Sequence, residues 1–104
     1  MNKRLDMLEK LTSSGKADSF AWYGLAMEYR KEKRVDDALA TFEKLRAADG
    51  EYVPMYLMAG QMLSESDRSA EAISWLEQGI QKARAKGDSK ALGELEQALV
   101  EARD

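Results

Sequence analysis

The side chains used most often for catalysis and metal binding are missing from this sequence. It contains no histidine and no cysteine. It therefore cannot build a disulfide, a thiol nucleophile, a Ser-His-Asp arrangement or the usual zinc ligand sets. Carboxylates, lysines and arginines are the chemistry-bearing groups that remain. We expect no cofactor, no metal and no enzymatic activity.

Two short acidic clusters are the remaining candidates for calcium binding or acid–base chemistry. Asp36 is followed directly by Asp37, and Glu65 lies close to Asp67. Neither cluster has the alternating oxygen ligands of a calcium-binding loop. Carboxylates at a helix start interact favourably with its exposed N–H groups, so we interpret both clusters as solvated helix-end residues.

The basic run RKEKR, residues 30–34, is the candidate for a contact with phosphate. The chain carries a net charge of −3, and the run is expected at a helix C-terminus, where cations complement exposed carbonyl groups. We therefore expect no nucleic-acid partner. No apolar run reaches the ~18 residues of a membrane span, and the N-terminus lacks the apolar core of a signal peptide. We expect no membrane partner and a cytoplasmic location.

The elements that must position these residues are helices. Strong helix formers dominate the 104 residues, and the single proline is Pro54. Turn signals near residues 13–15, 33–34, 49–50, 64–66 and 87–88 separate six segments of helical length. The sequence thus predicts an all-α domain in which short connections make neighbouring helices antiparallel.

The chain is self-similar at a spacing of 34 residues. At this shift large apolar residues align with large apolar residues and small residues with small ones: Trp22 with Tyr56, Ala26 with Gly60, Ala38 with Ala72 and Phe42 with Leu76. The backward shift places Phe42 on Leu8 and Leu45 on Leu11. The first helix therefore resembles the second half of a repeat whose first half is absent.

The pattern Trp22-x2-Leu25-Ala26-x2-Tyr29, followed by Ala38-x3-Phe42, resembles the tetratricopeptide repeat (TPR) family, and small bacterial TPR proteins in particular. It departs from the family in Ala26, where glycine is usual, and in the missing closing proline. The resemblance implies one domain with two helical hairpins, at 19–52 and 53–86. A half-repeat helix at 1–18 and a C-terminal capping helix at 87–104 would complete a right-handed α-solenoid.

The helical period also separates core from surface. Trp22, Leu25, Ala26 and Tyr29 share one side of their helix, and we expect them in the core. Trp75 is expected to pack rather than bind. We expect the flanking helices to seal the stack, because a hairpin cannot bury both faces alone. Their sealing residues would be Leu5, Leu8 and Leu11 at one end, and Leu92, Leu95 and Leu99 with the N-cap Asp88 at the other.

A second face of the same helices is the candidate binding surface. It lies roughly 130° around from the Trp22 stripe, and the resemblance implies that it lines a concave, peptide-binding groove. Methionine and aromatic side chains offer adaptable apolar contacts. The expected peptide-binding residues are Phe20, Tyr23, Met27, Arg30, Lys31, Leu57, Met58 and Gln61. Alternatively, a terminal helix folds over this groove.

The expected ligand is an apolar or amphipathic segment of another protein. TPR domains that bind chaperone C-termini hold the carboxylate with lysine, asparagine and arginine. The matching positions here are Tyr23, Met27, Met58, Asp88 and Leu92, which cannot do so. Arg30 and Lys31 would meet an acidic flank of the ligand. The sequence predicts a non-catalytic protein-interaction module, and the alternative is a self-associating domain that buries the same face in a homodimer.

Overall fold

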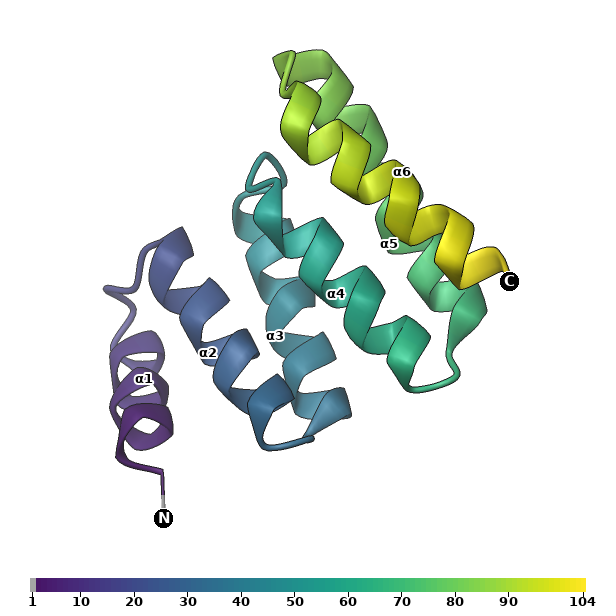
Figure 1. The fold of residues 1–104 in the computed structure, drawn as a ribbon. Helices are drawn as coiled ribbons and strands as arrows, with labels where there is room; N and C mark the ends of the chain where they lie inside the picture. The colour runs from purple at the N-terminus through teal and green to yellow at the C-terminus, as the bar shows by residue number, and fades with distance from the viewer. Residues whose placement is uncertain (1) are drawn as a thin grey trace. The chain divides into compact units, whose positions relative to one another are not determined.

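The computed structural model describes residues 2–104, and this part of the chain forms six helices (Figure 1). They are α1 (Lys3–Ser13), α2 (Ser19–Lys31), α3 (Val35–Ala48), α4 (Pro54–Glu65), α5 (Ser69–Lys86) and α6 (Ser89–Arg103). Residues 2–104 contain no strand. The predicted all-α class is confirmed, and each predicted helical segment is present.

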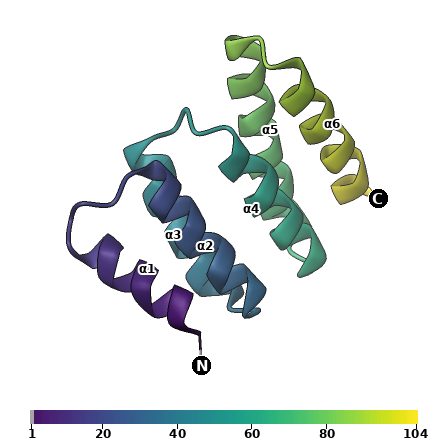
Figure 2. The same ribbon diagram turned by 60° about the vertical axis from the view of Figure 1, so that its left-hand side comes forward.

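The chain divides between Gly50 and Glu51 into two compact units. In the first unit, α2 packs against both α1 and α3. In the second, α5 packs against both α4 and α6, and α6 also contacts α4. Figure 2 shows α5 and α6 side by side, joined by a short connection. The finer division at residues 18, 52 and 86 remains a prediction.

Polar side chains fix where several helices begin. Asn2, Asp18 and Asp88 each accept a hydrogen bond from a backbone N–H in the first turn of the helix that follows. Such caps satisfy donors that the helix itself leaves unpaired. Asp88 Oδ1 accepts from the N–H of Ala91 at 3.0 Å, which confirms the predicted N-cap. Pro54 opens α4, where its missing N–H costs no helical hydrogen bond.

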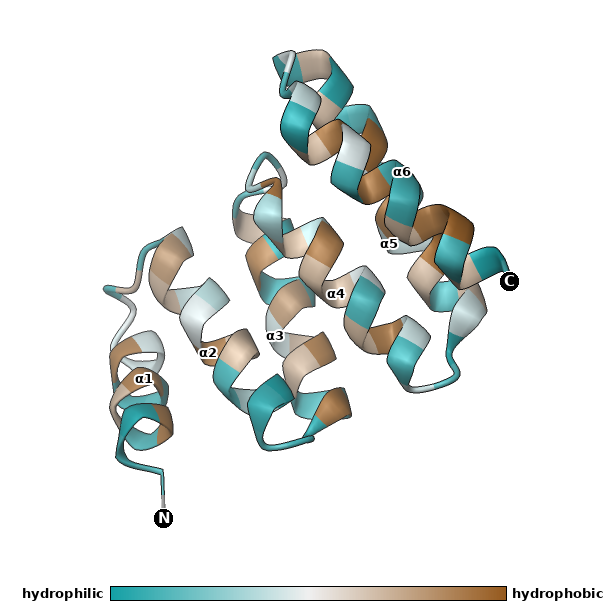
Figure 3. Ribbon diagram, in the orientation of Figure 1, coloured by the Kyte–Doolittle hydropathy of each residue, from teal (hydrophilic) through white to brown (hydrophobic). Residues whose placement is uncertain are grey.

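The turn that ends α2 is repeated at the end of α4. Lys33 and Asp67 adopt the left-handed backbone, with φ of 60° and 59°. The following residues, Arg34 and Arg68, each donate a backbone N–H to a carbonyl in the last turn of the helix, at 2.9 Å. This is the Schellman arrangement, in which glycine is the usual left-handed residue. The turn after α2 is among the hydrophilic segments in Figure 3. The 34-residue repeat thus extends to backbone geometry.

Small residues bring the helices of the second unit into close contact. A Cβ added to Gly60 would lie 2.4 Å from Leu76 Cδ2, and one added to Gly79 would lie 2.5 Å from Tyr56 Cβ. The ring of Tyr56 also packs against Trp75, with centroids 6.0 Å apart. Trp75 is buried, which confirms its predicted packing role.

The first unit has a corresponding core between α2 and α3. Ala26, Ala38, Phe42 and Leu45 are fully buried, as the sequence pattern predicted. Ser19 Oγ donates to Asp49 Oδ2 at 2.6 Å and so links the start of α2 to the residue that follows α3. The hairpin is therefore closed by apolar packing along its length and by a polar contact at its open end.

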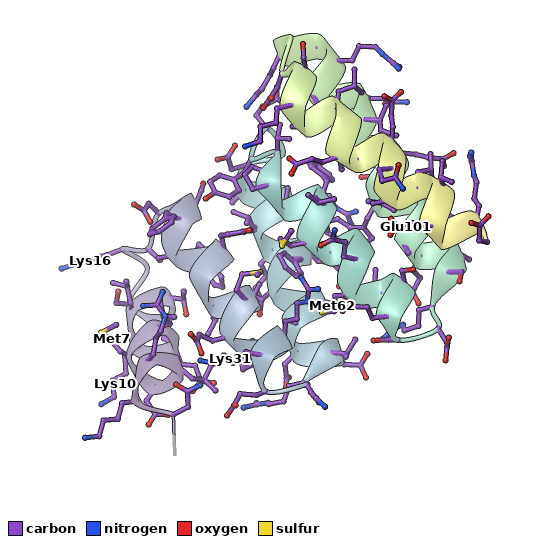
Figure 4. The ribbon with its side chains drawn as sticks, viewed as in Figure 1. Met7, Lys10, Lys16, Lys31, Met62 and Glu101 are labelled. Atoms are coloured by element: carbon purple, nitrogen blue, oxygen red, sulfur yellow. The ribbon has the colours of Figure 1, made fainter. Side chains whose placement is uncertain are left out.

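Helix α1 packs on α2 through a smaller apolar cluster formed by Leu5, Leu8 and Leu25. The expectation that Leu11 would seal this end is wrong, because its side chain is 40% exposed. The buried residue of the last turn is Thr12, which lies one turn after Leu8 on the inward face. Leu11 shares the outer face with Met7, and Figure 4 shows Met7 pointing away from α2.

A buried carboxylate adds a polar link between α1 and α2. Glu28 is only 8% exposed. Its carboxylate accepts a hydrogen bond from Asn2 Nδ2 at 3.1 Å and lies 2.9 Å from Arg4 Nε. A buried charge is tolerated when it is paired and hydrogen-bonded in this way. Asn2 therefore both caps α1 and helps to hold it on α2.

Candidate functional site

The five predicted residues of the first unit lie on α2 or at its last turn. Phe20 is 69% exposed, Lys31 is exposed, and Tyr23, Met27 and Arg30 are half-buried. Spacings of three and four residues bring these side chains onto one side of the helix. Lys31 is labelled at this end of α2 in Figure 4. The surface thus combines apolar side chains with two cations near the helix C-terminus.

The three predicted residues of the second unit lie on α4, and all of them are half-buried. Leu57 and Gln61 form one wall of a groove of about 510 Å³ between α4 and α6. Met58 does not line this groove. The opposite wall consists of α6 residues, namely Ser89, Lys90, Gly93, Glu94, Gln97, Ala98 and Glu101.

The α6 residues of this groove were not among the predicted binding residues, because α6 was predicted to be a capping helix and only Asp88 and Leu92 were compared with a groove. A helix that follows two hairpins occupies the place of a further first-half helix, and this reasoning could have identified its groove face. Glu94 and Glu101 are exposed and border the groove. Gly93 leaves space there, since no atom lies within 4 Å of a Cβ added to it.

In the basic run 30–34, Arg34 is engaged by contacts within the first unit. Arg34 Nε lies 2.9 Å from Asp37 Oδ2, and its guanidinium carbon lies 4.6 Å from the centre of the Tyr29 ring. The hydrogen bond with Asp37 raises the pKa of Arg34 above its ordinary value. Arg30 and Lys31 lie in the last turn of α2, as predicted for cations that complement a helix C-terminus.

The first acidic cluster lies at a helix start, as predicted, whereas the second lies at the C-terminal end of α4. Asp36 and Asp37 are in the first turn of α3, and Asp67 occupies the left-handed position of the turn after Glu65. Within residues 2–104, no three His, Cys, Asp or Glu side chains gather as a metal site requires. None of the helices described is long and apolar enough to cross a bilayer.

The Tyr29 phenol has a raised pKa in the first unit. Burial, and after it the hydrogen bond from its hydroxyl to Glu9, together raise its pKa from 10.0 to about 12. The Oη–Oε2 distance is 2.6 Å. The phenol therefore stays neutral and keeps donating to Glu9 at physiological pH. This hydrogen bond links α1 and α2.

The tetratricopeptide repeat family model matches residues 21–49 and 53–84. Among curated proteins, no relative matches the chain.

Two solved structures of a tetratricopeptide repeat domain protein from Salinibacter ruber are 40% identical to the chain, each with a TM-score of 0.75. The solution structure covers 82% of this chain and 86% of its own, and the crystal structure covers 83% and 97%. A protein from Bordetella parapertussis is similar in fold, with a TM-score of 0.84 at 22% identity, over 99% of this chain and 90% of its own.

Proposed function

Since this chain belongs to the tetratricopeptide repeat family, we propose that it is a non-catalytic module that binds an apolar or amphipathic segment of another protein. Members of this family are in general protein-interaction modules. The proposed binding residues are Phe20, Tyr23, Met27, Arg30 and Lys31 on α2, and Leu57, Met58 and Gln61 on α4. The cytoplasmic location and the lack of nucleic-acid and membrane partners stay predictions.

The groove between α4 and α6 is the observation that carries the proposal. Leu57 and Ala98 supply apolar surface, while Gln61 and Gln97 supply amide donors and acceptors. Glu94 and Glu101 add negative charge to the α6 wall. A segment with an apolar face and a polar, partly basic flank would satisfy both kinds of surface. Since such a groove is short, the complex would bury little area and would be weak and transient.

The α2 surface supports the same class of ligand with the opposite charge preference. Phe20 exposes most of its ring, and Met27 adds a flexible apolar side chain about two turns further along the same side of α2. Arg30 and Lys31 favour an acidic group on the ligand. We therefore propose that apolar side chains supply most of the contact area on α2 and that the cations orient the ligand.

Peptides selected from a random library for binding to the chain provide the probe. Gly93→Gln extends a side chain into the groove from α6 and replaces a poor helix former by a better one. We expect it to weaken binding of groove-directed peptides at least tenfold, as measured by calorimetry. Val100→Gln is the matched control, because Val100 is exposed on the same helix and does not line the groove. Equal binding by Gly93→Gln and the unmodified chain would refute a groove site.

Met27→Asp tests the α2 surface. Because Met27 is half-buried, Met27→Asp is expected to cost about 1 kcal/mol of stability, whereas Phe42→Ala removes a fully buried ring and costs about 3–5 kcal/mol. We expect Met27→Asp to remain folded and to lose peptide affinity. If it unfolds as readily as Phe42→Ala, Met27 belongs to the core. Light scattering tests the homodimer alternative: a dimer that Met27→Asp converts to a monomer would replace the peptide proposal.

A further inference from the structure

A second cavity lies in the first unit and uses none of the proposed peptide-binding residues. Its volume is about 270 Å³, and α1, α2 and α3 all contribute to its lining. The side chains that matter for its chemistry are Glu9 and Thr12 from α1, Trp22 and Tyr29 from α2, and Thr41 and Lys44 from α3. Although Trp22 and Tyr29 were expected in the core, both are only half-buried, because they border this cavity.

Both aromatic rings of the cavity already attract cations of the chain itself. Lys44 Nζ lies 5.8 Å from the centre of the Trp22 ring, close to the ~6 Å limit of a cation–π contact. The Arg34 guanidinium lies closer to the Tyr29 ring, at 4.6 Å. The electron-rich faces of the rings are thus accessible to positive charge, and the contact of Lys44 with Trp22 is the looser of the two.

The hydroxyl groups that line the cavity direct their protons elsewhere. Thr12 Oγ1 donates to the carbonyl of Leu8 at 2.9 Å, and Thr41 Oγ1 donates to that of Asp37 at 2.8 Å. The Tyr29 hydroxyl donates to Glu9. Since a hydroxyl carries one proton and accepts through its lone pairs, these groups can only accept from a ligand. The Glu9 carboxylate is likewise an acceptor and bears a negative charge.

Apart from Lys44, the lining offers aromatic faces, lone pairs and a carboxylate, which suit a cation that carries N–H donors. We propose that this cavity binds a primary alkylammonium group, specifically the side chain of a lysine on a partner protein. The ammonium would lie over the Trp22 ring and donate to Glu9 and to a threonine hydroxyl. An ammonium has several N–H donors and no acceptor, which matches this lining. Lys44 then acts as an intramolecular competitor for the same ring.

Titration with Nα-acetyl-lysine methylamide, followed by the indole N–H signal of Trp22 in NMR spectra, tests the proposal. We expect saturable binding with a Kd on the order of 1–10 mM, because one charge and one ring contact are involved. The Trp75 signal is the internal reference, since this side chain is buried in the second unit. Nα-acetyl-norleucine methylamide has a similar length without the charge. Equal binding of the norleucine compound would overturn the proposal.

Three variants separate a specific site from a general effect of charge. Lys44→Met removes the competitor and should tighten lysine binding about two- to fivefold. Lys10→Met makes the same charge change on α1, outside the lining of this cavity, and should leave the affinity unchanged. Glu9→Gln keeps an acceptor for Tyr29 but removes the negative charge, so it should weaken binding.

Circular dichroism establishes that each variant is folded before its affinity is interpreted. Tightening by Lys44→Met but not by Lys10→Met supports the site. Equal tightening by both lysine variants, or no change in Lys44→Met, overturns it. Loss of peptide binding in Gly93→Gln with retained lysine binding would confirm that the two sites are separate.

Discussion

The close approach of α4 and α5 at Gly60 leads to a quantitative prediction about stability. A Cβ at Gly60 would lie 2.4 Å from Leu76 Cδ2 and 2.5 Å from Leu76 Cγ. Carbon atoms prefer a separation of about 3.5–4.0 Å, so one of the two groups would have to move by roughly 1 Å. Leu76 is fully buried and has little room to do so. Gly60→Ala therefore overpacks the core of the second unit.

Two opposing energies decide the sign of this change. Replacing glycine by alanine inside a helix gains about 0.8–1 kcal/mol of helix propensity. Overpacking a core costs typically about 1–3 kcal/mol and occasionally more. Because the overlap is large and involves a branched carbon, we expect the clash to dominate and Gly60→Ala to destabilise the chain by about 1–2 kcal/mol.

Gly93→Ala is the matched control, because Gly93 also lies within a helix but no atom comes within 4 Å of its added Cβ. This variant should gain most of the propensity, about 0.5–1 kcal/mol. Urea unfolding followed by circular dichroism at equilibrium measures both free energies. The two variants should therefore differ by about 1.5–3 kcal/mol, with opposite signs relative to the unmodified chain.

A double-mutant cycle assigns the cost of Gly60→Ala to a particular side chain. Leu76→Ala alone should lose about 2–5 kcal/mol, but it also removes the atoms that clash. In the Gly60→Ala background its cost should fall by more than ~1 kcal/mol. Additive effects, or a Gly60→Ala variant as stable as the unmodified chain, would refute the close contact between these helices.

Three further predictions concern single residues. Lys33→Gly should stabilise the chain by about 0.5–1 kcal/mol, because glycine adopts the left-handed backbone without strain. Urea unfolding measures this free energy. Lys33→Ala keeps the strained backbone and should give no gain in stability. Asp88→Ala removes the N-cap of α6 and should cost about 1 kcal/mol in the same assay. The raised pKa of Tyr29, about 12 instead of 10.0, gives stability that is present below pH 10 and is lost as the pH rises toward 12. Between these pH values the unmodified chain should lose more stability than Tyr29→Phe, and parallel pH profiles would contradict this assignment.

The helices and their repeat could be predicted because their signals are local. The N-cap Asp88 and the 34-residue spacing of small and aromatic residues act within one or two turns of the chain. Alanine and glycine also recur at the repeated positions, and small residues permit close packing of helices, as Gly60 does against Leu76. Such features depend on intrinsic helix preferences and periodicity, which a sequence displays directly.

The position of α1 was harder to predict, because Leu11 and Thr12 follow Leu8 by three and four residues. Either spacing can face the neighbouring helix, and hydrophobicity alone favoured Leu11. Burial of Thr12 became possible because its hydroxyl bonds to the carbonyl of Leu8 within α1. Whether Leu11 or Thr12 is buried depends on how α1 is rotated about its own axis against α2.

The polar groups of the first unit depend on contacts between residues distant in sequence. Glu28 is held by Asn2 and Arg4, and Tyr29 by Glu9. No local pattern marks these pairs, since each residue taken singly resembles an ordinary surface or core residue. The α6 side of the groove was missed for a different reason, because α6 was interpreted as a capping helix and its place after two hairpins was not used. The eight predicted interaction residues remain a hypothesis for the experiments above.

Helix α1 is a half hairpin, and this has a thermodynamic consequence. It buries three residues, Leu5, Leu8 and Thr12, so it is expected to detach by local unfolding before α2 and α3 open. Detachment would carry Glu9 and Thr12 away, so the Tyr29 hydroxyl would lose its acceptor and the cavity would lose its α1 side. A lysine that contacts residues of both α1 and α2 binds only the form in which α1 is packed on α2. Its binding would therefore slow amide hydrogen exchange throughout α1. The packing of α1 on α2 and the binding of lysine in the cavity are then linked, so each stabilises the other.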